Sequence, residues 1–544
     1  MNAPRMNALR RLARDILESR AKSTSLLLGI CALLFLPSIG LYPLFDVDEG
    51  AFSEATREMI ASGDWISTTL NGLPRFDKPI LIYWLQAGSV EVFGLTEFAL
   101  RMPSALAGLA WIAAIAWFAI PRLGNSKGML AGWIAASCLG VAAIGRAATA
   151  DALLNALIAL TMFDLWRTFE TGSCAALRRT YLWVALGVLT KGPIAILIPV
   201  ATGLLYCASM RRWRDLARIA TDPLGWVILV AVAAPWYVVQ LRLHGQAFID
   251  GFLLRHNVER FGGTLEGHSG SLFYYVLIVP LLLLPWTGLA WRTARAAPAD
   301  WRDPLLRYLW IWFAFVFVFF SLSGTKLPHY ALYGATPLFV LFACRTREAA
   351  SAASLLLIPC VLACAIPFFP YAVDWYSHSQ AAAANVRISF YVAQTARALR
   401  VAGSWYYVIS GACAAVALVA CCASSRPAWS RALVATGALS VSLAFALAPW
   451  LGELLNGPVA DAGRMAAQIG GPAVQWEFTA PSFSVYRGAQ TPARAPKPGE
   501  MAITRVDRID PDVPAQLLFR EGGVALMLRP PTAAPPPETP GNTD

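Results

Sequence analysis

The sequence predicts a mainly helical protein that crosses a membrane many times. Of its 544 residues, 57% are hydrophobic and only 14% are charged, whereas soluble domains carry about a quarter charged residues. Apolar runs of about 18–24 residues recur along most of the chain, and each is long enough to cross the hydrocarbon core as a helix. The net charge is +11, and its Lys and Arg residues lie mostly in short loops between these runs. This placement favours membrane topology over nucleic-acid binding.

About thirteen apolar runs are expected to span the membrane. The first run follows a basic N-terminus but is not followed by a small-residue cleavage site, so it is expected to be a retained helix. The shorter segment Ile80–Phe93 is expected to be an interfacial or re-entrant helix. The runs cover residues 24–43, 101–121, 128–147, 152–170, 180–191, 193–210, 223–243, 272–291, 304–323, 328–344, 351–370, 404–423 and 432–450.

Loop charges assign the two sides of the membrane. Loops rich in Arg and Lys alternate with loops that are not, and the basic N-terminus falls on the basic, hence cytoplasmic, side. Residues 1–450 therefore form a membrane domain whose loops 44–100 and 244–271 lie outside. Residues 451–528 are more polar and contain strand-like runs at 474–485 and 524–528, which predict a small outer α/β domain. The Pro-rich residues 529–544 are predicted to be disordered.

Several classes of protein are disfavoured. The ten cysteines include no CxxC pair and lie mostly in or beside apolar runs, so neither a disulfide framework nor a thiolate metal site is expected. The sequence has no Walker loop, zinc-protease helix or nucleophile elbow, which disfavours ATP-driven pumps. The charges concentrate in outer loops and no internal repeat is visible, which favours an enzyme over a secondary transporter or lipid-linked-sugar flippase.

The first outer segment predicts a helix on the membrane surface. Ala51, Ala55 and Met59 form an apolar stripe at helical spacing, with Asp48 and Glu49 at its start. These two carboxylates are candidate catalytic groups. The structural alternative is that Asp46 or Asp48 caps the helix and that the helix dipole favours Glu49.

Charged residues near the ends of apolar runs are further candidates. Lys78, beside Asp77, can bind a lipid phosphate as a point charge; the alternative is an interfacial anchor. Asp151 opens one apolar run and Lys191 lies between two others, and charges at such positions are costly enough to indicate function. The alternatives are a helix cap for Asp151 and snorkelling for Lys191.

The later outer loops supply histidines and more cations. His256, Arg260 and His268 lie in the long loop, and neutral histidine is the commonest metal ligand. With carboxylates in neighbouring loops, a divalent metal (Zn, Mg or Mn) is a candidate cofactor. Lys326, in a segment that ends in Tyr330, can meet a phosphate or a lipid headgroup.

These segments together resemble one family. The motifs occur in the same order as in that family over roughly residues 24–345, and their combination is more specific than any single motif. The family is that of polytopic, polyprenyl-phosphate-sugar-dependent glycosyltransferases related to protein O-mannosyltransferases, and within it the chain is most similar to bacterial 4-amino-4-deoxy-L-arabinose lipid A transferase. The residues that carry the resemblance are Asp48-Glu49-Gly50-Ala51-Phe52-Ser53-Glu54, Arg57-Glu58-Met59, Gly63-Asp64-Trp65, Phe76-Asp77-Lys78-Pro79, Tyr83-Trp84, Lys191-Gly192-Pro193, Pro235-Trp236-Tyr237, Arg260-Phe261, His268, Phe273-Tyr274-Tyr275 and Gly324-Thr325-Lys326-Leu327-Pro328.

The resemblance implies a GT-C type membrane fold and an inverting transfer of sugar from polyprenyl (undecaprenyl) phosphate to an envelope acceptor such as lipid A. It implies a bacterial inner membrane, a cytoplasmic N-terminus, a periplasmic active site and no nucleotide cofactor. Asp48, with Glu49, would be catalytic. The residues that would bind the donor phosphate are Lys78, Arg57, Arg260, Lys326, Lys191, Tyr83 and Tyr330, and a metal would be held by Asp77, Asp151 and either His268 or His256.

The chain also departs from its relatives. Asp77 stands where lipid A-modifying relatives usually have Glu, and Ser323-Gly324-Thr325-Lys326 stands where they usually have Ala-Lys-Gly-Lys. Gly50 and Ala51 replace aromatic or basic residues, and the C-terminal region matches weakly. Transfer to a protein or to another envelope glycan therefore remains the alternative within the family.

Overall fold

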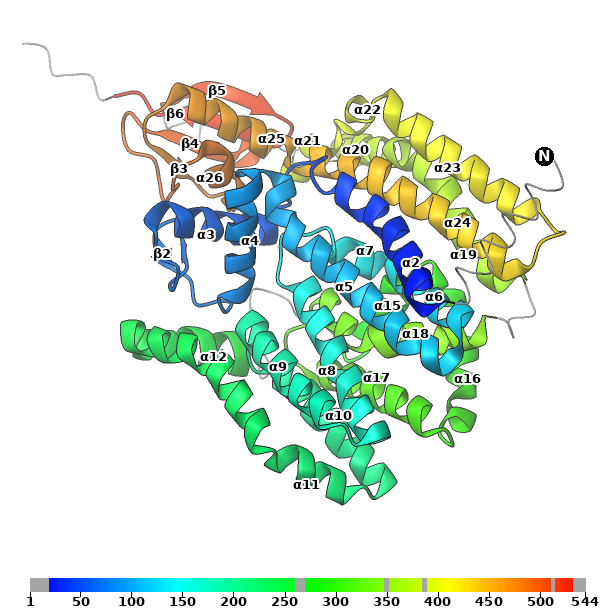
Figure 1. The fold of residues 1–544 in the computed structure, drawn as a ribbon. Helices are drawn as coiled ribbons and strands as arrows, with labels where there is room; N and C mark the ends of the chain where they lie inside the picture. The colour runs from blue at the N-terminus through cyan, green and yellow to red at the C-terminus, as the bar shows by residue number, and fades with distance from the viewer. Residues whose placement is uncertain (1–18, 260–269, 347–351, 384–388, 510–513, 532–544) are drawn as a thin grey trace, which may run out of the picture.

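A bundle of long helices carries a small α/β unit at one end (Figure 1). The computed structural model describes residues 19–259, 270–346, 352–383, 389–509 and 514–531. Arg260 and His268 lie outside these ranges, and of His256 only the backbone is described.

The helices of the first half of the chain begin and end close to the predicted apolar runs. Glycine ends many of them, as it does at Gly63, whose φ of 71° suits a residue without a side chain. They are α2 (Arg20–Phe35), η1 (Leu36–Ser38), α3 (Asp48–Ser62), α4 (Leu81–Phe93), α5 (Glu97–Leu123), α6 (Asn125–Ser137), α7 (Leu139–Ile144), α8 (Asp151–Thr171), α9 (Cys174–Lys191), α10 (Ile194–Met210), α11 (Trp213–Thr221), α12 (Pro223–His244), α13 (Gln246–Phe248) and the π-helix η2 (Ile249–Glu259).

The helices of the second half are shorter and more often interrupted, frequently beside prolines that cannot continue the backbone hydrogen bonds. They are α15 (Tyr274–Leu282), η3 (Trp286–Leu289), α16 (Ala290–Asp300), α17 (Pro304–Leu322), η4 (Pro328–Gly334), α18 (Ala335–Arg345), α19 (Ala352–Ala365), η5 (Ile366–Phe368), α20 (Phe369–Ala383), α21 (Phe390–Thr395), α22 (Ala398–Val401), α23 (Ser404–Cys422), α24 (Ala428–Ser442), the π-helix η6 (Leu443–Leu447), α25 (Ala448–Ile469) and α26 (Pro481–Arg487).

Fewer helices than the predicted thirteen are both long and apolar enough to cross a membrane. Within the described ranges there are eight, or nine if the pair Tyr274–Leu282 and Trp286–Asp300, bent by 113°, counts as one span. The run 128–147 is divided at Cys138, and α10 has only 17 residues. The multi-pass architecture is confirmed, and the count of thirteen is not.

The first outer segment folds as the apolar stripe predicts. Ala51, Ala55 and Met59 on α3 are buried, with 4%, 0% and 1% of their surfaces exposed. They lie between α4, which confirms the predicted helix at 80–93, and the C-terminal unit. A two-stranded hairpin joins the two helices, formed by β1 (Thr69–Leu70) and β2 (Leu73–Pro74). Burial of this stripe fixes α3 against the C-terminal unit, which was predicted to be an outer domain, and Asp48 lies at the beginning of α3.

The C-terminal unit is a four-stranded sheet packed on two helices. Its strand order is β3-β4-β6-β5, with β3 parallel to β4 and the other pairs antiparallel. Side chains of α25 and α26 pack on the sheet around Phe483 and Ile503. The strands are β3 (Ala473–Gln475), β4 (Met501–Arg505), β5 (Gln516–Glu521) and β6 (Val524–Leu528).

Two sequence predictions about this unit need correction. The run 474–485 is not one strand, because Pro481 begins α26 after β3 has ended. The boundary expected at residue 451 falls inside α25, which continues from the apolar bundle into the outer domain. The strand predicted at 524–528 is present as β6.

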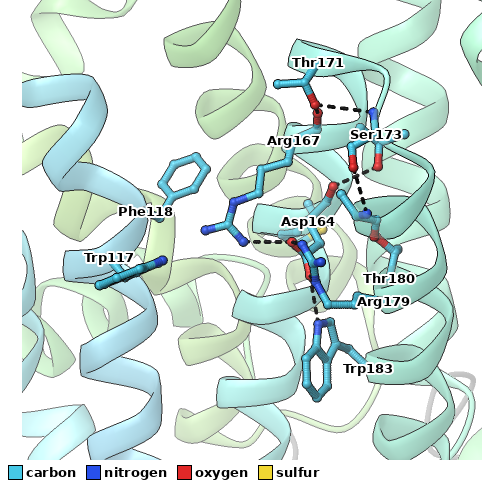
Figure 2. Close-up of polar contacts among 12 residues, drawn as sticks. Trp117, Phe118, Asp164, Arg167, Thr171, Ser173, Arg179, Thr180 and Trp183 are labelled. Carbon is cyan, nitrogen blue, oxygen red and sulfur yellow. Dashed lines mark hydrogen bonds and ion pairs between the residues drawn. The ribbon is translucent and has the colours of Figure 1, made fainter. Parts of the chain in front are cut away.

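The opposite end of the bundle is held by a buried acidic residue on α8. Asp164 accepts bonds from Arg167 at 2.7 Å, from Arg179 at 2.8 and 2.9 Å, and from the Trp183 indole at 3.0 Å (Figure 2). Only 2% of its surface is exposed. Every carboxylate lone-pair direction here faces a donor, so the cluster ties α8 to α9.

Candidate functional site

A cavity of about 460 Å³ opens at the end of the bundle that carries the outer domain. Its lining includes both charged and apolar side chains, which suits a molecule that has a charged head and a hydrocarbon part. The polar lining comes from Asp46, Asp48, Glu49, Arg146, Thr149, Asp151 and His329. The apolar lining comes mainly from α7, η6 and α25, through Leu139, Ala142, Ala143, Leu443, Ala444, Leu447, Ala448 and Leu451.

The predicted residues Asp151 and Lys191 form one ion pair at this cavity. Lys191 Nζ lies 2.5 Å from Asp151 Oδ1 and donates to the Tyr333 hydroxyl at 2.9 Å. His329 Nε2 lies 3.6 Å from Asp151 Oδ1 and 3.5 Å from Lys191 Nζ. Asp151 begins α8 and Lys191 ends α9, so the antiparallel pair of helices brings them together. Both are mostly buried, which strengthens their electrostatic interaction.

Asp48 stands at the mouth of the cavity and remains exposed. Its pKa is raised above the ordinary aspartate value because the surrounding protein desolvates it and Asp151 and Asp77 repel its charge, against the attraction of Lys191 and Lys78. An accessible carboxylate with a raised pKa is a better proton acceptor than an ordinary aspartate. It does not cap α3 through its side chain, since the helix begins at Asp48 itself and Val47 is the capping residue.

Lys78 lies in the same electrostatic neighbourhood as Asp48 and Asp151. Its ammonium donates to Asp77 Oδ1 at 2.6 Å, while Arg75 donates to Asp77 Oδ2 at 3.0 Å. Two cations on one carboxylate leave a net positive charge at this edge of the site. A phosphate can therefore be attracted here while Asp77 keeps both cations oriented.

Glu49 has a structural role that is distinct from the predicted catalytic one. Only 3% of its surface is exposed, and it pairs with Arg101 through bonds of 2.9 and 2.7 Å. It also accepts from the backbone of Ala148 at 2.6 Å and of Phe45 at 2.7 Å. With both oxygens occupied, Glu49 fixes the shape of the segment before α3, and its catalytic role stays a prediction.

Arg57 and Lys326 each have partners within the fold, and their contact with the donor phosphate stays a prediction. Arg57 forms a bidentate pair with Glu54 at 2.6 and 2.7 Å and faces the carbonyl of Gly488 in the outer domain. Lys326 is 5% exposed and donates to the carbonyls of Ser323 at 2.6 Å and Ser321 at 2.8 Å. Desolvation lowers its pKa. It caps the end of α17, where carbonyl groups lack helical partners.

The two predicted tyrosines lie in different surroundings. Tyr83 is fully buried and stacks on Phe52 with 5.5 Å between ring centroids, so it has no surface left for a phosphate. Tyr330 lies against the ion pair, with its ring centroid 5.6 Å from Lys191 Nζ and 4.8 Å from the His329 ring. Through its contact with Lys191, Tyr330 lies beside the candidate site.

The predicted metal site stays a prediction, because its candidate histidines lie outside the described side chains. No three His, Cys, Asp or Glu side chains among them come close enough together to hold a metal ion. Asp77 and Asp151 are each paired with lysine. The predicted histidine ligands, His256 and His268, lie where no side chain is described.

Three residues of the site were not singled out from the sequence. His329 and Tyr333 follow Lys326 closely in the chain, and helix η4 directs both toward Lys191. Arg146 is 7% exposed, lines the cavity and donates to carbonyls of Leu34 and Ala142 and to the Ser38 hydroxyl. A charged residue near the end of an apolar run was the available signal for Arg146.

Comparison with known proteins agrees with this geometry. Residues 77–238 match the family model of dolichyl-phosphate-mannose-protein mannosyltransferase. The chain is 33% identical over 320 residues to the undecaprenyl phosphate-alpha-4-amino-4-deoxy-L-arabinose arabinosyl transferase of Aeromonas salmonicida, and 31% identical over 336 residues to that of Pseudomonas aeruginosa PAO1. These matches span 57% and 59% of each chain, for the two pairs respectively.

The fold matches over a longer part of the chain. The crystal structure of ArnT from Cupriavidus metallidurans bound to undecaprenyl phosphate superposes with a TM-score of 0.73 at 22% identity, covering 92% of this chain and 97% of that one. Its apo state gives a TM-score of 0.75 over the same shares. The chain is thus similar in sequence, over little more than half its length, to these transferases, and it shares the fold of ArnT over most of its length.

Proposed function

We propose that the protein is an inverting glycosyltransferase that moves a sugar from undecaprenyl phosphate to lipid A. The observation that carries the proposal is that Asp48 and Asp151 line one cavity, with Lys191 paired to Asp151 and Lys78 close enough to act on the charge of Asp48. The named transferases of Aeromonas and Pseudomonas supply the sugar, 4-amino-4-deoxy-L-arabinose, as the first to test.

The donor phosphate would lie against the cationic edge formed by Lys78, Arg75 and Lys191. A polyprenyl phosphate is a good leaving group, so the main tasks are to stabilise the departing phosphate charge and to hold the acceptor in line behind the anomeric carbon. The new bond joins the acceptor oxygen to that carbon, and the bond from the carbon to the phosphate oxygen breaks, which inverts the centre.

Asp48 would act on the acceptor. For a hydroxyl acceptor it takes the proton as the oxygen attacks, for which its raised pKa is favourable. A lipid A phosphate is already ionised and needs no base. For such an acceptor, Asp48 would instead orient the acceptor. Proton transfer by such a group contributes about 10²–10⁴-fold to rate.

We also place the site on the periplasmic side of the bacterial inner membrane. The far end of the bundle carries Arg122, Lys127, Arg178 and Arg179 in short connections, which the positive-inside rule assigns to the cytoplasm. A membrane-impermeant thiol reagent should label Asp461→Cys in spheroplasts, while the native exposed Cys174 and Cys422 react only after permeabilisation. The opposite pattern would reverse the orientation.

Transfer by Asp48→Asn tests the chemistry directly. Purified variants in vesicles are given the undecaprenyl-phosphate-linked aminoarabinose and lipid A, and the product is measured by mass spectrometry. We expect a loss of about 100-fold or more for Asp48→Asn and none for Asp461→Asn, a matched change on the exposed surface of α25. Wild-type rates for Asp48→Asn would remove Asp48 from the mechanism, and transfer to another glycan or to protein would correct the acceptor.

A further inference from the structure

The segment that precedes Asp48 is hydrogen-bonded to the C-terminal domain. Asp46 Oδ1 accepts from the backbone N–H of Ser482 at 2.9 Å, and Oδ2 accepts from the Ser482 hydroxyl at 2.5 Å. The Asp46 N–H donates to Asn456 on α25 at 3.1 Å. Both oxygens and the backbone of Asp46 are thus bound to the outer domain and its supporting helix, two residues before Asp48.

A glycine makes this approach sterically feasible. A Cβ added at Gly50 would lie 2.1 Å from Asp46 Oδ1 and 2.5 Å from the Ser482 nitrogen. Carbon atoms do not come this close to other groups, so any side chain at position 50 would push α26 away from α3.

The inner face of the same segment is fixed independently. Arg101 donates to the carbonyls of Ile39, Tyr42 and Pro43, each at 2.8 Å, and pairs with Glu49. It is fully buried. Residues 39–49 are therefore fixed by Arg101 of the helical bundle and, independently, by Ser482 of the C-terminal domain.

We propose that the C-terminal domain is a positioning module for Asp48, acting through a latch between Ser482 and Asp46. The inference rests on the proposed function for the role of Asp48. Although Asp46 also lines the cavity, its role here, with Ser482, is to set the position of the neighbouring backbone, and so the distance from Asp48 to the acceptor. An error of about 1 Å in such a position can cost about 100-fold in rate.

The latch and the reaction can be tested separately in the full-length protein. Ser482→Ala removes the hydroxyl bond, Ser482→Thr retains it, and Ser484→Ala is the matched control because it lies on the same helix but bonds to Asn71 at 3.0 Å. Hydrogen exchange of the peptide that spans residues 44–48 reports the latch without any need for activity. Transfer kinetics report its consequence.

We expect faster exchange at residues 44–48 in Ser482→Ala and about a tenfold lower kcat, with KM for the donor within twofold of wild type. Ser482→Thr should restore both, and Ser484→Ala should change neither. Gly50→Ala should lower kcat further. Wild-type exchange and kcat in Ser482→Ala would overturn the latch. A wild-type protein that transfers no sugar, while exchange still responds to Ser482→Ala, would instead refute the proposed function.

Discussion

Two buried carboxylates on helix α8 have different kinds of partners. Asp164 bonds to two arginines and a tryptophan, and each of its oxygens is used. Asp151, thirteen residues earlier and hence about 20 Å away along the helix, pairs with a lysine beside a histidine and lines a cavity. Planar guanidinium groups saturate a carboxylate, whereas a lysine ammonium is a point charge with donors to share. A saturated cluster holds helices together, and a shared charge at a cavity can meet a ligand.

The largest effect is expected at Lys191. Lys191→Met should lower transfer per folded molecule by more than about 100-fold, because it removes a cation from the donor site. It also leaves Asp151 buried and unpaired, which costs about 3–5 kcal/mol. The double variant Asp151→Asn/Lys191→Met should therefore recover thermal stability but not transfer. If the double variant transfers sugar at the wild-type rate, the pair is only structural.

The next effect is expected at the far end of the same helices. Asp164→Asn should lower the free energy of unfolding by about 1.5–3 kcal/mol through loss of charged hydrogen bonds. Transfer per folded molecule should stay within about twofold of wild type. The checks are the thermal midpoint in detergent and the rate normalised to folded protein. A loss of transfer without a loss of stability would show that Asp164 acts in the reaction, and would contradict the distinction drawn between Asp164 and Asp151.

The smallest effect is a shift in the pH dependence of transfer. Asp48 acts as a base only when it is ionised, so activity rises with pH through its raised pKa. Lys78→Met removes an attractive charge and should move this acid limb to higher pH by about half a unit. Asp77→Asn removes a repulsive charge and should move it to lower pH by a similar amount. Profiles of kcat against pH for the two variants check the sign, and shifts in one common direction would contradict the electrostatic account.

Periodicity in the sequence was enough to predict the helices that position the site. The stripe of Ala51, Ala55 and Met59 predicts α3 because a surface helix must bury one face. The family resemblance brought Asp48 and Lys78 to one region, which no local pattern could do. The spans were overcounted because apolar runs also form broken or tilted helices inside the bundle, as at Cys138.

Three predicted site residues share one physical feature that the sequence did not reveal. Each is charged and lies in a predicted outer segment, but each already has hydrogen-bond partners within the fold. They are Glu49, Arg57 and Lys326. The partner of Arg57, Glu54, lies three residues away and could have been expected from helical spacing. The partner of Glu49, Arg101, lies 52 residues away in sequence, so only the folded chain brings them together. His329 was missed because its role depends on η4 facing the ends of α8 and α9.

Helix α25 leaves the apolar bundle and enters the outer domain without a break. A continuous helix, and not a flexible linker, therefore joins the C-terminal unit to the bundle. For the proposed reaction, we infer that both lipids enter the cavity laterally from the bilayer leaflet. The rate of such entry would depend on the fluidity of the surrounding lipid, so temperature and acyl-chain composition would control the proposed transfer.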